Sequence, residues 1–169
     1  MAEKQAVKEG TKKAQSFSSI HKLGGLVYFC SIIDGIEGDI NLLNKVMQSI
    51  NNDKKARQWG KFLISSNDDV LVAQGHVPSE LSKEKGLDIK EWTKKLMSFL
   101  PHADLLEIND EFSKFEMRVG SEEEIFPFKL CDDMIQNNVH FLKTKGLIQD
   151  VKEESEDEGG YADEAGIEW

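Results

Sequence analysis

An eight-residue segment, Lys-Lys-Ala-Arg-Gln-Trp-Gly-Lys at positions 54–61, has the residue types that bind a polynucleotide. Four cations offer charge to phosphate groups, and one indole ring offers a surface on which a base can stack. The same composition is typical of a solvated loop between a helix and a strand, with the tryptophan covering the edge of the core. Keeping both alternatives open, we name five candidate nucleic-acid-binding residues: Lys54, Lys55, Arg57, Trp59 and Lys61.

Three carboxylates, Asp34, Glu37 and Asp39, follow an apolar run, at a position where α/β proteins often place a functional site. Their oxygens are the ligands that a divalent cation prefers. However, the intervening glycines lack both the G-x-G-x-x-G spacing and the lysine of a phosphate-binding loop. We therefore expect an acidic loop that caps a helix, with no metal, no cofactor and no catalytic residue.

The cysteines and histidines also give no sign of a metal site or a catalytic residue. Cys30 and Cys131 lie within apolar segments, which favours two buried free thiols in a reducing, cytoplasmic setting. The four histidines are scattered along the chain, and there is no C-x-x-C pair, so a structural zinc site is not expected. No run of 18 apolar residues is present, so we expect no membrane partner.

The net charge of −10 is concentrated at the C-terminus. Residues 150–169 hold nine acidic residues and one basic residue, whereas the other 149 residues hold 22 acidic and 20 basic ones. The acidic stretch cannot bury enough apolar surface to offset the entropy of ordering, so it is expected to be a disordered tail. Its aromatic end, Trp169, suits either docking to a protein partner or simple solvation.

The rest of the 169-residue chain predicts an α/β fold, in which helices flank a mixed sheet. We expect two parts, a helix over residues 1–22 and a globular domain over residues 23–149. The helix is polar, is weakened by Gly10, and is expected to project from the domain. The apolar run Leu26–Ile33 predicts a central strand that is covered on both faces. Asp39 then caps a helix whose apolar face is formed by Ile40, Leu43, Val46, Met47 and Ile50.

The remaining elements follow from spacing and turn chemistry. Strands at Lys61–Ser65 and Val70–Val77 are joined by a four-residue turn, and Asp88 caps a helix with Trp92 on its apolar face. Residues 102–108 suit either a strand or a loop. Lys114–Val119 alternates like a strand. Pro127 begins a last helix, and we expect its apolar stripe to comprise Phe128, Cys131, Ile135, Val139 and Leu142.

Four stretches of the chain carry a further signal through their order. They are Leu26-Val-Tyr-Phe-Cys, Gly60-Lys-Phe-Leu-Ile, the hairpin that runs into Val77-Pro78, and Lys85-Gly86-Leu87 followed by Glu91-Trp92. This order resembles the C-terminal domain (C-Ala) of eukaryotic cytosolic alanyl-tRNA synthetase, and the resemblance extends over residues 2–148.

The resemblance implies a non-catalytic accessory domain that binds and positions tRNA in protein biosynthesis. Such a domain is not an enzyme by itself but part of an ATP-dependent alanine–tRNA ligase in the cytoplasm. Its implied partners are tRNA, bound weakly, and the catalytic and editing domains of that synthetase if the chain is a fragment of it.

One segment departs from the family pattern. Residues 100–111 replace the family's glycine-rich basic loop with a stretch that has no glycine and four acids. Glycines let backbone N–H groups approach phosphate closely, and acids repel it. The alternative is therefore a repurposed protein–protein interaction module, which uses the same fold and its acidic tail.

Overall fold

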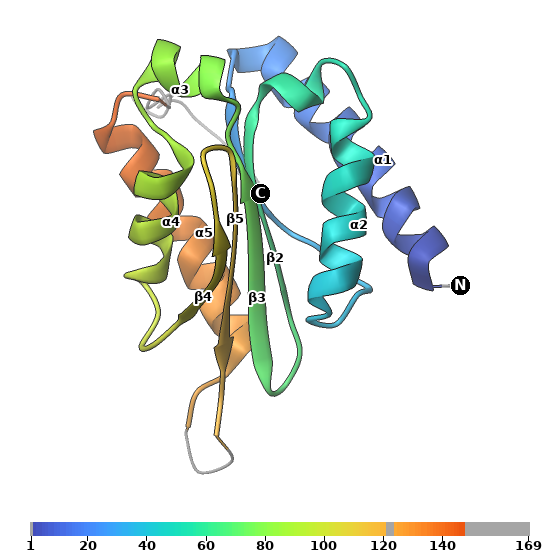
Figure 1. Cartoon of the computed structure of the whole chain (residues 1–169), viewed down its shortest axis with the longest axis vertical. Helices are drawn as coiled ribbons and strands as arrows, with labels where there is room; N and C mark the ends of the chain where they lie inside the picture. Colours follow the sequence, from blue (N-terminus) through green and yellow to red (C-terminus); the bar gives the residue numbers. More distant parts are fainter. Residues whose placement is uncertain (1, 121–123, 148–169) are drawn as a thin grey trace, which may run out of the picture.

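The computed structural model describes residues 2–120 and 124–147, which form an α/β fold around one five-stranded mixed sheet (Figure 1). The elements, in chain order, are α1 (Ala2–Gly24), β1 (Tyr28–Ile32), α2 (Ile40–Asn51), the 3₁₀ turn η1 (Ala56–Gln58), β2 (Gly60–Ser66), β3 (Val70–His76), α3 (Ser79–Lys85), α4 (Ile89–Met97), β4 (Asp104–Ile108), β5 (Phe112–Arg118) and α5 (Pro127–Thr144). The predicted fold class is confirmed.

The strand order is β1-β2-β3-β5-β4, so β3 lies in the middle and β1 lies at an edge. β1 runs parallel to β2, whereas the other three pairings are antiparallel. The expectation that Leu26–Ile33 is the central strand is therefore wrong. Its continuous apolar character arises because helices cover both faces of this edge strand, which buries Tyr28 on one side and Phe29 on the other.

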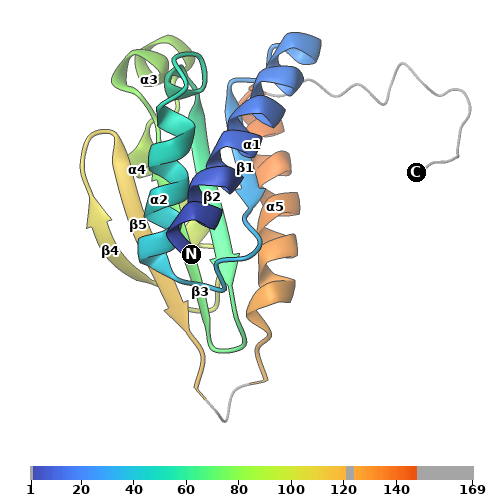
Figure 2. The ribbon, with the colours of Figure 1, turned by 90° about the vertical axis from the view of Figure 1, so that its right-hand side faces the viewer.

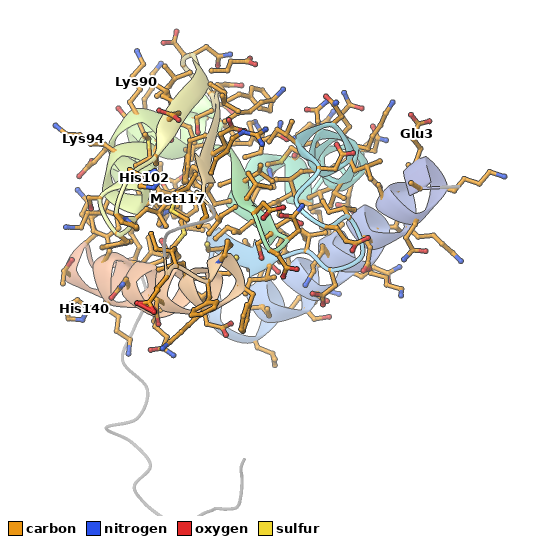
Figure 3. The ribbon with its side chains drawn as sticks, turned by 90° about the horizontal axis from the view of Figure 1, so that it is seen from below. Glu3, Lys90, Lys94, His102, Met117 and His140 are labelled. Carbon is orange, nitrogen blue, oxygen red and sulfur yellow. The ribbon has the colours of Figure 1, made fainter. Side chains whose placement is uncertain are left out.

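Each face of the sheet has its own helical layer and its own apolar core. The pair α1 and α2 covers one face over β1, β2 and β3 and encloses the first core, and α4 and α5 cover the opposite face and enclose the second core (Figures 1 and 2). Viewed from one end, Lys90 and Lys94 point outward from α4 while Met117 of β5 lies inside the second core (Figure 3). Trp92 is fully buried there, as expected, and its indole N–H donates to Asn138 Oδ1 at 2.7 Å.

The N-terminal helix does not project from the domain, contrary to the sequence-based expectation. α1 crosses α2 diagonally (Figures 1 and 2) and buries Ala6, Ala14 and Phe17 in the first core. Gly10 lies at the closest approach of the two helices: a Cβ at this position would press on the Cβ of Ser49 and lie 2.6 Å from the carbonyl oxygen of Val46. The glycine that weakens the isolated helix is thus what permits its packing.

Local signals fixed the starts of three helices as predicted. Asp39 Oδ1 accepts from the backbone N–H groups of the first turn of α2, and Asp88 Oδ1 accepts from the N–H of Glu91 in α4. Pro127 is the first residue of α5. The hairpin between β2 and β3 is closed by Asn67, whose side-chain oxygen accepts from the N–H groups of Asp69 and Val70.

Two other elements differ from the expectation. α3 was not predicted, because its sequence is almost entirely polar and buries one side chain, Leu81. In α5 the predicted stripe is partly wrong: Phe128 is 65% exposed and Val139 is exposed at the helix surface, whereas Met134, Asn138 and Phe141 are buried. The buried face is rotated toward Asn138, whose side-chain oxygen accepts from the indole N–H of Trp92.

Residues 102–108, for which the sequence allowed either a strand or a loop, contain the edge strand β4. The proposed boundary at residue 22 falls inside α1, which continues to Gly24 and ends where Gly25 takes a positive φ of 74°. The predicted acidic tail, residues 150–169, lies outside the described residues. Among the described residues, no helix is long and apolar enough to cross a membrane.

We predict that Gly10→Ala destabilises the protein by about 1–3 kcal/mol, because overpacking of the α1–α2 contact outweighs the gain of about 1 kcal/mol in helix propensity. Gly24→Ala is the matched control, since nothing lies within 4 Å of a Cβ at that position. Urea denaturation of both variants measures the effect. A Gly10→Ala protein as stable as the Gly24→Ala protein would contradict the packing of α1 on α2.

Candidate functional site

The basic segment forms a tight turn that presents three of its five candidate residues to solvent. Asp53 Oδ1 accepts from the backbone N–H groups of Lys55 at 2.9 Å and Ala56 at 3.0 Å, which folds the chain into η1. Lys54, Lys55 and Arg57 are exposed around this turn. They can contact an anionic partner, although Arg57 shares a shallow surface hollow with Glu80 and Glu84.

Trp59 is placed differently from the expectation. Its side chain is buried, with the ring centroid 5.5 Å from that of Phe29 and 4.8 Å from that of His21. The indole therefore closes the first core between α1 and β1 and offers no open face to a base. The alternative, in which Trp59 covers the edge of the core, is the one that the geometry supports.

Lys61 is also enclosed, with an exposed fraction of 0%, so it cannot contact a phosphate on the surface. It is the second residue of β2, and its Nζ lies 2.8 Å from Asn51 Oδ1 and 2.8 Å from His76 Nδ1. Burial lowers the pKa of Lys61 to about 7, and the charge of Glu111 opposes that shift. Lys61 is thus part of a polar cluster of Asn51, Lys61, His76 and Glu111, called the buried polar cluster because Lys61 and His76 at its centre are buried, while Asn51 and Glu111 are partly exposed.

His76 completes this cluster from the end of β3. Burial, with a further contribution from the charge of Lys61, lowers its pKa to about 3, so the imidazole is neutral at physiological pH. Its Nε2 lies 3.9 Å from Glu111 Oε1, and its ring stacks on Phe112 with centroids 4.3 Å apart. The predicted strand Val70–Val77 placed His76 next to its end, but no sequence pattern indicated the pairing of His76 with Lys61.

The other groups with potential chemistry are separated or shielded. Asp39 uses its carboxylate to cap α2, and across the described ranges no three His, Cys, Asp or Glu side chains are arranged to hold a metal ion. Cys30 and Cys131 are free thiols. Burial raises the pKa of both, so neither forms a thiolate readily at neutral pH.

The most open feature of the sheet is β4. All five of its residues are exposed, and three of them are aliphatic: Leu105 and Leu106 at 46% and Ile108 at 37%. β4 pairs with β5 on one side, and the pairing shifts register between Leu105 and Glu107. The outer side of β4 has no neighbouring strand within the described part of the chain.

Comparison with known proteins gives no family assignment: neither the scan against protein-family models nor the search of curated proteins finds a match. The resemblance to the C-terminal domain of alanyl-tRNA synthetase therefore stays a prediction.

We predict that Lys61 makes stability depend on pH. Its pKa is about 7 in the folded protein and near the ordinary 10.5 when unfolded, so between these values the unfolded chain binds more protons. The free energy of unfolding attributable to Lys61 then rises with pH from about 7 upward, by at most about 1.4 kcal/mol per pH unit.

The measurement is urea denaturation of wild type and Lys61→Met from pH 7 to 9, with the surface variant Lys55→Met as the control. The stability difference between wild type and Lys61→Met should shift in favour of wild type as pH rises, while the Lys55→Met difference stays constant. Equal slopes in all three proteins would show that Lys61 keeps its ordinary pKa.

Proposed function

We propose that this chain is a non-catalytic protein-interaction module in which the outer edge of β4 pairs with an extended segment of a partner. The observation that carries this proposal is the open edge itself, with three exposed aliphatic side chains on five residues. An unpaired strand edge presents N–H and C=O groups that a second strand can satisfy, and apolar side chains beside it add affinity.

The charge around β4 favours a basic partner segment over a second copy of this chain. Asp104 and Glu107 are exposed on β4, and Asp110 follows in the turn to β5. Glu107 and Asp110 each have one lysine of this chain 3.6 Å away, whereas Asp104 has no ion pair among the described residues. Two β4 strands placed side by side would bring these acids together, whereas lysine or arginine side chains on an extended partner would complement them. The register shift in β4 further disfavours a flat pairing between copies.

The non-catalytic character is supported by where the reactive groups lie. Lys61 and His76 are enclosed in the buried polar cluster, and the pKa values of both thiols are raised by burial. Free thiols fit a reducing compartment, so the cytoplasm is the location that we propose. The acidic C-terminal stretch remains a second candidate contact for a protein partner by its composition alone.

The test uses two synthetic hexapeptides that alternate valine with lysine or valine with glutamate, titrated into the ¹⁵N-labelled full chain. We expect amide shifts along β4 with the lysine peptide, weaker shifts at high salt, and none with the glutamate peptide. Leu106→Pro should abolish the effect by removing a backbone donor, whereas Leu106→Ala, which keeps the donor, should retain it. Shifts that are absent from β4, or that survive in Leu106→Pro, would refute the pairing.

A second candidate function is the tRNA-positioning role of an alanyl-tRNA synthetase accessory domain, with that enzyme's catalytic and editing domains as further partners. The observation that favours it is the group of three exposed cations on one turn, Lys54, Lys55 and Arg57. Three phosphate contacts make a small footprint, and Glu80 and Glu84 lie beside it, so affinity is expected to be micromolar or weaker.

This candidate predicts salt-sensitive tRNA binding that falls by roughly 30-fold between 50 and 200 mM salt, as about three counterions are released. Replacing Lys54, Lys55 and Arg57 together with alanine should remove the binding. The matched control replaces three exposed lysines on other helices, Lys83, Lys94 and Lys129, and should bind almost as wild type. Filter binding or fluorescence anisotropy measures both, and equal losses in the two triple variants would reject a specific role for the turn.

A further inference from the structure

A groove of about 570 Å³ lies between α2 and the β4–β5 hairpin, on the face of the sheet that α1 and α2 only partly cover. Figure 2 shows the hairpin extending beyond α2, which leaves this side of β5 without a helix above it. The volume lies within the range of small-molecule sites. The groove is separate from the basic turn, and Glu107 is the one residue of β4 that lines it.

The lining of the groove is rich in side-chain amides. They come from α2, from the residue that follows it, from β3 and from the turn before β5: Asn44, Gln48, Asn51, Asn52, Gln74 and Asn109. An amide carries a donor and an acceptor without net charge, and the oxygens of Asn44, Asn51 and Asn109 already accept from groups of the protein. The charged residues on the far wall, Lys114 and Glu107, pair with each other at 3.6 Å. The groove is therefore polar and close to neutral, which suits an uncharged ligand with several hydrogen-bonding groups.

Gln74 identifies where such a ligand would be held. It is 2% exposed, and its Nε2 donates to Asn44 Oδ1 at 2.8 Å. Its Oε1 is buried and has no hydrogen-bond partner. An unsatisfied buried acceptor destabilises the empty groove, and a donor from a bound molecule would remove that cost. Because Asn44 uses its oxygen to accept from Gln74, the NH₂ group is what Asn44 offers a ligand.

Phe112 supplies a flat apolar surface in the same groove. It is partly exposed, it lines the groove, and its ring is held by stacking on His76, with an interplanar angle of 17°. His76 is in turn held by Lys61. The buried polar cluster thus fixes an aromatic ring close to an orphaned acceptor and an amide donor.

We propose that this groove binds a single nucleobase, either of a free nucleoside or of a single-stranded RNA. A base has a donor next to an acceptor on one edge, which matches Gln74 Oε1 and the Asn44 NH₂, and it has a π face that stacks on Phe112. A peptide main chain shares the amide edge but has no ring to stack, so the aromatic floor decides between them. Since the groove is nearly neutral, the phosphate contributes little, and binding is insensitive to salt.

The test titrates adenosine, cytidine and uridine, each up to about 10 mM, into the ¹⁵N-labelled full chain. We expect at least one nucleoside to shift the side-chain NH₂ signals of Gln74 and Asn44, equally at low and high salt. Its 5′-monophosphate should bind with similar affinity. A short single-stranded homopolymer of the same base separates the two sources, because tighter binding per base than the monomer indicates RNA.

Gln74→Leu should weaken binding about tenfold or more, since it removes the acceptor, and Phe112→Leu should weaken it by removing the stacking surface. The matched control Gln136→Leu changes an exposed glutamine on α5, across the sheet from the groove, and should bind as wild type. If Gln74→Leu does not fold, Phe112→Leu carries the test alone.

Three results would overturn the proposal. The first is that no nucleoside shifts these signals, and the second is that the shifts persist in both groove variants. The third is that an uncharged tri-alanine amide shifts the signals while the nucleosides do not. None of these results bears on peptide pairing at β4, and salt dependence separates this site from the cations of the basic turn.

Discussion

The architecture depends on one constraint, the burial of both faces of β2 and β3. All seven residues of β3 are buried, as are six of the seven in β2. A strand buried on both sides requires an apolar layer against each face, which is why a sheet of this kind needs two pairs of helices. The packing of α1 follows from this need, because α2 alone cannot cover its side of the sheet. The polar residues Lys61, Gln74 and His76 are enclosed for the same reason, as they lie on the α2 side of these strands.

The parts of the fold that the sequence predicted are those set by short-range chemistry. Asp39, Asp88 and Pro127 mark helix starts because a cap involves only the next two or three residues. The burial of Trp92 follows from the spacing of one helix. In contrast, the edge position of β1 depends on how five strands are ordered, and strand order is not written in the apolar pattern of any one strand.

In the candidate site, too, the sequence did not predict contacts between residues that are distant along the chain. The composition of residues 54–61 predicted a cationic surface with an aromatic ring, and the three cations nearest the turn are indeed exposed. Trp59 and Lys61 are not, because their surroundings come from distant segments: Phe29 and His21 for the ring, and His76 for the ammonium group. One clue to Lys61 was present, since it lies on the same strand face as Leu63 and directly precedes the apolar run Phe62–Ile64. The orphaned oxygen of Gln74 had no counterpart in the sequence, because only the packed structure reveals which acceptor lacks a donor.

The pairing of β3 with β5 has a consequence for how the chain folds as it is synthesised. Val70 lies opposite Arg118, so 48 residues separate partners in the middle of the sheet. At a synthesis rate of about 5–20 residues per second, β5 is synthesised roughly 2–10 s after β3. Until then, the side of β3 that pairs with β5 has no partner strand. During that interval a strand whose first four residues are all apolar has one open side, and the non-local closure that ends the interval is intrinsically slow. The nascent chain is therefore most exposed to misassociation, and most in need of a chaperone, after β3 has emerged and before β5 has joined it.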